Sequence, residues 1–291
     1  MKLGLGTVQF GLDYGISNNS GKTSLLEAES ILQSANNFGI DMLDTASLYG
    51  DSEAVVGQSM HGQTFQIVTK TPQFKTPQIK KEHAAQLKQA FNNSVNKLQV
   101  DNVYGLLIHH ADDLINEGSE YLMEALEQIK ASGKAQKIGV SVYSAEQVEK
   151  ILERYQIDLI QLPLNVFDQR LVASGILKDL KRRGVEIHVR SIFLQGLLLM
   201  KLHQLPTRFT PFKAGIESYH RALSDYGLSP LQGSLLYVNS IEEVDYAIVG
   251  VTNADELQEI VGSLHKTLQT LPDWQKFSCN DERLINPVNW Q

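Results

Sequence analysis

Short apolar runs alternate with amphipathic segments along this chain, and the alternation limits the folds that it can adopt. Eight of the runs have the length and composition of buried strands, and they cover residues 2–6, 40–43, 65–69, 103–108, 138–141, 159–162, 185–189 and 246–249. Between them, apolar residues recur at helical spacing. We expect a helix capped by Ser24 that ends near Gly39, and helices over residues 78–98, 118–131, 145–155, 176–183, 214–226 and 254–268.

Strands buried on both faces and separated by helices indicate an α/β fold with a parallel sheet that is covered by helices. Eight strand–helix units in 291 residues fit one closed (β/α)8 barrel, the TIM barrel. A doubly wound open sheet is the alternative, and it usually carries a Gly-x-Gly-x-x-Gly turn after its first strand. Gly4 and Gly6 match that turn poorly, so we expect a single barrel domain over residues 1–291, with a C-terminal tail from about residue 271.

The composition narrows the classes of function. The formal net charge of −7 disfavours binding to nucleic acid or to anionic membranes, where a basic surplus is expected. The single cysteine, Cys279, excludes an internal disulfide framework and a cysteine-cluster metal site, and we expect no bound metal. No apolar run approaches the roughly 20 residues of a membrane-spanning helix, and the first residues lack the pattern of a signal peptide. We therefore expect a cytoplasmic protein whose partner is a small molecule.

Four polar residues end or closely follow three of the apolar runs: Asp44, Tyr49, Lys70 and His109. In a parallel barrel the C-terminal ends of the strands build one site, and neighbouring strands lie only about 4.8 Å apart. A nearby ammonium group would lower the pKa of the Tyr49 phenol, and Asp44 would keep Lys70 charged. Together they predict general-acid catalysis by Tyr49 at a carbonyl oxygen that His109 orients. Taken singly, each of the four also has a structural explanation, such as a cap, a turn or a solvated strand end.

At these residues the chain resembles the aldo-keto reductase superfamily, over nearly its whole length. The matching stretches are LGLGTVQFG, DMLDTASLYGDSE, IVTK, LLIHH, IGVSVYS, IQLPLNVFDQR, RSIFLQGLL and IVGVTNADELQEI. The resemblance implies a (β/α)8 barrel that binds a nicotinamide cofactor over the strand ends and transfers a hydride to a carbonyl. It also implies Tyr49 as the acid, Asp44 and Lys70 as its tuning pair, and His109 as the substrate-orienting donor. His110 is the alternative in that last role. The family pattern places the histidine directly after the Leu-Ile pair, which favours His109.

The resemblance further implies a cofactor site and a substrate pocket. The implied cofactor-binding residues are Gly6, Thr7, Val8, Asp44, Ser141, Gln161, Arg190, Ser191, Leu194, Gln195, Gly196, Leu197, Gly250, Val251, Thr252, Asn253, Glu256 and Glu259. The expected substrate-binding residues are Tyr49, His109, Gln9 and Asn165. NADP(H) is the family default. NAD(H) is also possible, because Glu256 stands where NADP-preferring relatives commonly carry an arginine, and an acidic side chain would repel a 2′-phosphate.

The sequence departs from the family pattern at two further positions. Val142 replaces the asparagine that helps to hold the carboxamide in many relatives, and Arg190 replaces an aromatic residue that stacks on the nicotinamide. A guanidinium group can stack on a ring and brings a fixed charge. Three roles for Arg190 stay open: binding an anionic substrate, binding a cofactor phosphate, or forming a structural salt bridge.

These patterns predict an NAD(P)H-dependent oxidoreductase that reduces a small polar aldehyde, ketone or sugar derivative, or runs the reverse oxidation of an alcohol. Two alternatives belong to other classes. One is a cofactor-binding regulatory barrel without significant turnover. The other is a lyase or isomerase in which Lys70 forms an imine. The sequence indicates neither the physiological substrate nor the oligomeric state.

Overall fold

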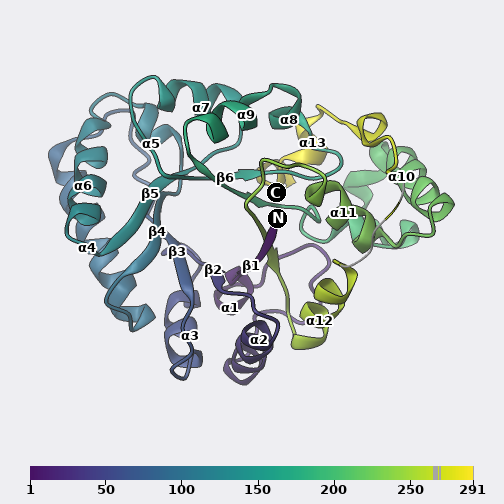
Figure 1. The fold of residues 1–291 in the computed structure, drawn as a ribbon, viewed down its shortest axis with the longest axis horizontal. Helices are drawn as coiled ribbons and strands as arrows, with labels where there is room; N and C mark the ends of the chain where they lie inside the picture. The colour runs from purple at the N-terminus through teal and green to yellow at the C-terminus, as the bar shows by residue number, and fades with distance from the viewer. Residues whose placement is uncertain (265–267, 269, 291) are drawn as a thin grey trace.

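Eight parallel strands close into a barrel, and Figure 1 shows the helices arranged around them. The computed structural model describes residues 1–264, 268 and 270–290. Each strand pairs with its neighbours in sequence, and β8 pairs with β1 to close the sheet. The strands are β1 (Lys2–Gly6), β2 (Met42–Asp44), β3 (Gln66–Lys70), β4 (Val103–Ile108), β5 (Ala135–Ser141), β6 (Leu159–Pro163), β7 (Glu186–Arg190) and β8 (Tyr246–Gly250). The predicted (β/α)8 barrel is confirmed.

One helix packs outside the barrel after each strand. These helices are α2 (Leu25–Asn37), α3 (Ser52–Ser59), α4 (Lys81–Leu98), α6 (Glu120–Ala131), α7 (Ala145–Leu152), α9 (Ile176–Arg182), α11 (Pro230–Asn239) and α12 (Ala254–Ser263). The loops and the tail add α1 (Val8–Gly11), α5 (Asp112–Ile115), α8 (Arg170–Ala173), α10 (Lys213–Asp225), α13 (Glu282–Ile285) and the 3-10 turns η1 (Leu197–Leu199), η2 (Leu202–Gln204), η3 (Thr207–Phe212), η4 (Trp274–Phe277) and η5 (Pro287–Trp290). In the part of the chain that the structure describes, no helix has both the length and the apolar character needed to cross a membrane.

Local contacts explain where the boundaries differ from the sequence prediction. The second strand begins at Met42 instead of residue 40, because Ile40 N donates to Ala35 O (2.9 Å) and so closes the end of α2. The helix expected over residues 78–98 is α4. It begins at Lys81 instead of residue 78, because Ile79 N donates to the carbonyl of Glu117 (2.7 Å). The expected helix over residues 254–268 ends at residue 263, and its residues 265–267 lie outside the described residues.

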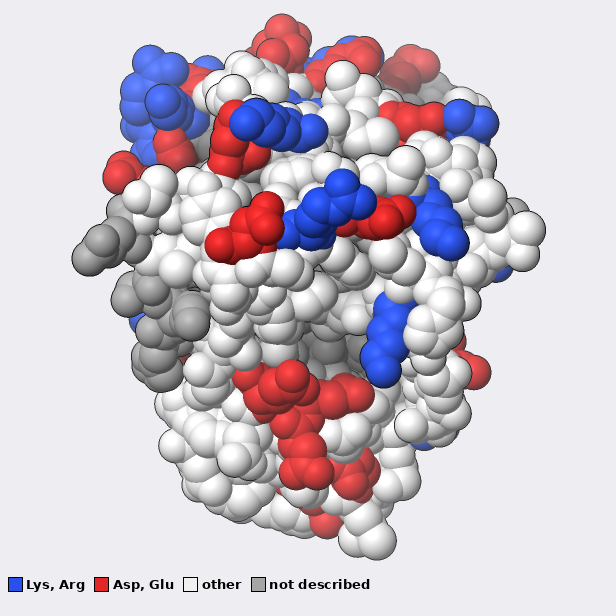
Figure 2. Space-filling view, turned by 90° about the vertical axis from the view of Figure 1, so that its right-hand side faces the viewer, with Lys and Arg blue, Asp and Glu red and all other residues white. Residues whose placement is uncertain are grey.

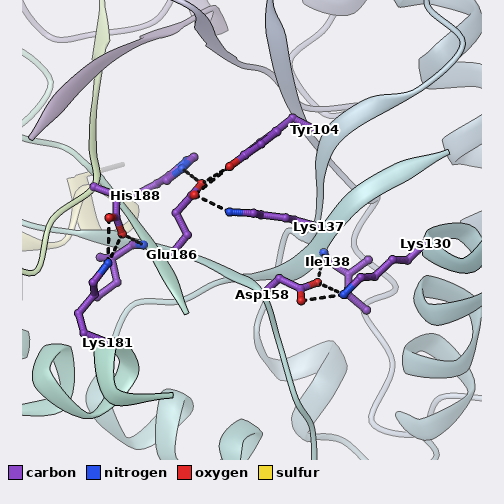
Figure 3. Close-up of polar contacts among 10 residues, drawn as sticks. Tyr104, Lys130, Lys137, Ile138, Asp158, Lys181, Glu186 and His188 are labelled. Carbon is purple, nitrogen blue, oxygen red and sulfur yellow. Dashed lines mark hydrogen bonds and ion pairs between the residues drawn. The ribbon is translucent and has the colours of Figure 1, made fainter. Parts of the chain in front are cut away.

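The interior of the barrel changes from apolar to polar toward the N-terminal ends of the strands. An apolar cluster of Met42, Val68, Leu107, Leu159, Tyr246 and Ile248 fills its middle. Below it, the Glu186 carboxylate accepts hydrogen bonds from Tyr104 Oη (2.8 Å), from Lys137 Nζ and from His188 Nε2 (2.8 Å), as Figure 3 shows. These four side chains join β4, β5 and β7 and leave the opposite end of the barrel for a site.

The C-terminal tail packs against the loops of the barrel. Trp274 and Trp290 are buried, and the Trp290 ring lies edge-on to Phe209 with centroids 4.8 Å apart. Gln169 Nε2 donates to Trp274 O (2.6 Å), which holds the start of the tail to the loop after β6. The tail's aromatic side chains therefore stabilise packing, whereas Pro287 and Val288 reach the pocket described below.

Candidate active site

A buried ion pair lies at the C-terminal end of β2 and β3. Lys70 Nζ is 2.8 and 2.7 Å from the two Asp44 carboxylate oxygens, and it also donates to Thr45 O (2.8 Å). Gln161, from β6 across the barrel, donates from Nε2 to Asp44 Oδ1 (2.7 Å). Burial lowers the pKa of the Lys70 ammonium group, and the Asp44 carboxylate opposes that shift. The extra hydrogen bonds matter, because a buried pair is stable only when its remaining polar atoms are satisfied.

Tyr49 lies on the loop after β2, and close backbone packing fixes that loop. A Cβ atom on Gly11 would lie 1.7 Å from Tyr49 O, so only glycine allows α1 to pack against the backbone of the Tyr49 loop. Ser52 Oγ donates to Thr7 O (2.7 Å) and ties the start of α3 to the end of β1. Lys70 Nζ lies 5.0 Å from the centroid of the Tyr49 ring. The structure thus brings Tyr49 and Lys70, both expected in the site, close to each other.

The pKa of Tyr49 is shifted in the direction opposite to the sequence prediction. Burial and then the Asp44 carboxylate raise the pKa of Tyr49, while Arg190 lowers it. We expected Lys70 to lower this pKa, but Asp44 pairs with Lys70 and offsets its charge. The phenol is therefore protonated at neutral pH, which is the state that a proton donor requires.

His109 follows β4 and faces Tyr49. The two rings lie edge to face, with centroids 5.7 Å apart and planes at 83°. Burial, assisted by the charges of Lys70 and Arg190, lowers the pKa of His109 to about 2, so the imidazole is neutral. His109 Nδ1 is buried without a hydrogen-bond partner among the described residues. His109 lines the pocket and His110 is not among the lining residues, which favours His109 as the donor.

One cavity of about 710 Å³ opens at the C-terminal ends of the strands, where most of the expected site residues meet. The expected residues that line it are Gly6, Thr7, Val8, Gln9, Asp44, Tyr49, His109, Ser141, Gln161, Arg190, Ser191, Gln195, Gly196, Gly250, Val251, Thr252, Glu256 and Glu259. Lys70 is buried and does not line the cavity, but it contacts the lining residues Asp44 and Tyr49.

Four expected contact residues support the walls and do not line the cavity. Asn165 is fully buried: its Oδ1 accepts from Phe167 N and Asp168 N (both 3.0 Å), and its Nδ2 donates to Ser191 O (3.2 Å). A substrate contact through Asn165 is therefore not supported, because this turn uses its amide. The remaining three are two buried leucines and a helix cap, namely Leu194, Leu197 and Asn253.

Residues 17–20, in the loop after β1, also line the cavity, which the sequence did not predict. Gln195 Nε2 donates to Tyr14 Oη (3.0 Å), and Ile16 N donates to Gln195 O (3.1 Å). Gly196 has φ 92°, and a Cβ there would lie 1.8 Å from Ser17 Oγ. The polar run of residues 17–20 carried no signal for this contact, because the covering depends on a loop nearly 180 residues away in the chain.

Side-chain carboxylates cap the N-terminus of α12 at the edge of the cavity. The Glu256 carboxylate accepts from Thr252 N (2.7 Å) and from Thr252 Oγ1 (3.0 Å). Glu27, from α2, accepts from Ala254 N (3.0 Å), and Asn253 Oδ1 accepts from Glu256 N (2.9 Å). On the face that carries α10, α11 and α12, Figure 2 shows acidic side chains gathered beside a hollow. Free N–H groups at a helix terminus suit a phosphate, but here acidic side chains already accept from two of the N–H groups.

The chain is similar to proteins of one family over almost its full length. The profile of the aldo/keto reductase family matches residues 2–273. The aldo-keto reductase YhdN of Bacillus subtilis (strain 168) is 24% identical over 312 residues, which cover 99% of this chain and 89% of that protein. The L-glyceraldehyde 3-phosphate reductase of Escherichia coli (strain K12) is 24% identical, with 87% of this chain and 84% of that protein covered.

A solved structure gives the same fold. The aldo-keto reductase AKR11C1 from Bacillus halodurans in its holo form superposes with a TM-score of 0.76 and 22% identity, covering 95% of this chain and 90% of that chain. At this identity the likeness establishes the barrel fold and does not extend to individual site residues.

Proposed function

The chain belongs to the aldo/keto reductase family, and on this premise we propose that it reduces a carbonyl compound with a nicotinamide cofactor, Tyr49 supplying the proton. One observation carries the proposal. The protonated Tyr49 lies above a buried Asp44–Lys70 pair and against the neutral His109. Tyr49, His109 and Asp44 line a single cavity. This is an arrangement of proton donors around the position of one oxygen atom.

Each residue of the site has a separate role in the proposed reduction. Ser141 and Gln161 would hold a reduced nicotinamide, which would supply the hydride for the carbonyl carbon. His109 donates a hydrogen bond to the carbonyl oxygen as a neutral group, so it orients the substrate without adding a charge. The Tyr49 hydroxyl then gives its proton to the oxygen as negative charge develops there. The buried Asp44–Lys70 pair packs against the Tyr49 ring and holds it in position for this transfer.

Two neighbouring polar side chains fit the carboxamide of a nicotinamide. Ser141 and Gln161 lie opposite each other in the paired strands β5 and β6, and both line the cavity. Gln161 Oε1 is buried and accepts no hydrogen bond among the described residues, because Gln161 Nε2 is turned toward Asp44. The amide N–H of a carboxamide would satisfy this oxygen. The cofactor assignment is therefore supported by an unsatisfied acceptor as well as by the family.

We propose NAD(H) as the preferred cofactor. Glu256 and Glu27 place two carboxylates at the N-terminus of α12, and they already accept from Thr252 N and Ala254 N. A 2′-phosphate on the adenosine ribose would meet like charge and occupied N–H groups there. A free 2′-hydroxyl can instead donate to a carboxylate. This choice departs from the NADP(H) default of the family.

The direct test is to titrate the protein with NADH and NADPH, following nicotinamide fluorescence, and then to screen aldehydes and ketones for oxidation of the bound cofactor. We expect NADH to bind more tightly and a polar aldehyde to be reduced. Failure of both cofactors to bind would contradict the proposal. Tight binding without turnover on any carbonyl would instead favour a regulatory barrel.

The surroundings of Lys70 disfavour a lyase or isomerase that works through an imine. Attack on a carbonyl requires a neutral amine with a free lone pair, whereas Lys70 Nζ donates to Asp44 and to Thr45 O. Borohydride trapping gives a simple check, since a reductase of this design forms no covalent adduct at Lys70.

A further inference from the structure

Arg190 is the one lysine or arginine among the described residues that line the cavity, and the reaction described above assigns no role to its charge. It is the last residue of β7. Its guanidinium carbon lies 4.3 Å from the centroid of the Tyr143 ring, and Nη2 donates to Val142 O (3.3 Å). The stack uses one face of the group and the hydrogen bond uses one of its five N–H donors. The contacts hold the guanidinium group in place and leave most of its donors available.

No acidic side chain neutralises Arg190 in the part of the chain that the structure describes, where none of the ion pairs includes it. The carboxylate of Asp44, which lines the same cavity, is already bound by Lys70 and Gln161. The structural salt bridge that the sequence left open is therefore not formed. A partly buried guanidinium group without a carboxylate is a strong binding site for an anion.

The charge of Arg190 reaches the proton donors. Arg190 lines the same cavity as Tyr49 and His109, and its charge lowers the pKa of both groups. Its side chain leans across the end of β6 toward Tyr143, which follows β5. The N-terminus of α12, which follows β8, lies on the other side of β7. Arg190 therefore points away from the helix terminus where the adenosine end of the cofactor is proposed to bind.

We propose that Arg190 determines the substrate class by binding an anionic group, a carboxylate or a phosphate, on the carbonyl compound that the enzyme reduces. The inference rests on the proposed reductase function and adds the substrate's charge to it. The planar guanidinium group can pair with two oxygens of such an anion at once, and Tyr143 fixes the plane in which it does so. The anion then sets the distance of the carbonyl from Tyr49 and His109.

Pairs of substrates that differ in charge test this role. Succinic semialdehyde is compared with butanal, and glyceraldehyde 3-phosphate with glyceraldehyde, in the wild type and in Arg190→Met. We expect Arg190→Met to reduce kcat/KM for the charged member of at least one pair by about tenfold or more, mainly through KM, and to change the neutral members little. The charged substrate whose kcat/KM falls more shows whether Arg190 binds a carboxylate or a phosphate. An equal loss for charged and neutral substrates would overturn the proposal.

Two controls separate this role from others. Arg221→Met, on the exposed face of α10, removes an equal charge outside the cavity. It should leave the ratio of kcat/KM for the charged substrate to that for the neutral substrate unchanged in both pairs. Tyr143→Leu keeps the charge but removes the stack, and we expect an intermediate loss. If Arg190→Met weakens NADH binding as much as it weakens turnover of the charged substrate, Arg190 serves a cofactor phosphate and the proposal fails.

A binding measurement keeps the inference testable without turnover. Succinate and inorganic phosphate are titrated calorimetrically into the wild type and Arg190→Met, each saturated with NADH. Binding of either anion to the wild type alone supports the role of Arg190, even if no aldehyde in the screen is reduced. Equal binding to both proteins, or no binding to either, contradicts it.

Discussion

The four polar residues at the strand ends show how far single side chains could be predicted. Asp44, Lys70 and His109 follow apolar runs that only buried strands explain, so their meeting at one end of the barrel followed from the pattern. Asn165 lies at a similar place after β6, yet its amide closes a turn. The sequence does not distinguish a polar residue that faces the cavity from one that closes a turn. The difference depends on which backbone N–H groups the fold leaves unpaired.

Replacing Tyr49 by phenylalanine tests the proton donor. The change removes only the hydroxyl and keeps the ring against His109 and Lys70. We expect kcat to fall by about 10² to 10⁴, the usual contribution of general-acid catalysis, with the NADH dissociation constant unchanged. Tyr121→Phe, on the exposed surface of α6, is the matched control. Turnover within a few fold of the wild type would remove Tyr49 from the mechanism.

At the scale of elements, local pattern predicted the strands better than it predicted some helices. The helices α3 and α11 were missed although each follows a barrel strand. In α3 the first turn contains the buried polar residues Ser52 and Glu53, which bond to the barrel and give no amphipathic pattern. In α11 the run Leu235–Val238 is buried throughout and reads equally well as a strand. Tertiary contacts decide both cases.

The close packing of α1 against the Tyr49 loop predicts a strong effect of Gly11→Ala. The added Cβ would lie 1.7 Å from Tyr49 O, so the loop must move. We expect a lower melting temperature and a lower kcat, measured by calorimetry and NADH oxidation. Gly262→Ala in α12 is the control, since a Cβ there meets nothing within 4 Å and alanine favours a helix. Equal behaviour of the two variants would show that the loop is not fixed by this contact.

The capped N-terminus of α12 predicts a change of cofactor preference. Glu256→Arg removes the carboxylate that accepts from Thr252 N and places a positive charge beside the terminus. We expect the ratio of NADPH to NADH affinity to rise by about tenfold or more, because a phosphate then gains a charged partner. Glu124→Arg, on the exposed surface of α6, makes the same charge change elsewhere. An unchanged ratio, measured by fluorescence titration, would contradict the placement of the adenosine ribose.

At the scale of the whole molecule, the barrel uses its two ends differently. The C-terminal end keeps unsatisfied polar atoms, such as Gln161 Oε1 and His109 Nδ1, which ligands can complete. At the N-terminal end, the side chains of Tyr104, Lys137 and His188 all donate to the Glu186 carboxylate and so join three strands (Figure 3). Sequence periodicity predicted the barrel but not this division. The inward direction of each polar residue depends on the register between strands.

The network at the closed end predicts how stability depends on pH. Hydrogen bonds from His188, Lys137 and Tyr104 outweigh burial and lower the pKa of Glu186 to about 2, from an ordinary value of 4.5. Because the folded pKa is the lower one, the stabilisation is complete above about pH 4.5 and is lost as the pH falls toward 2. We expect Glu186→Gln to reduce the free energy of unfolding by about 2 to 3 kcal/mol at pH 7. The difference from the wild type should shrink at pH 3. Urea unfolding at the two pH values measures both, with the exposed Glu124→Gln as control, and a difference that is independent of pH would contradict the role of the Glu186 charge.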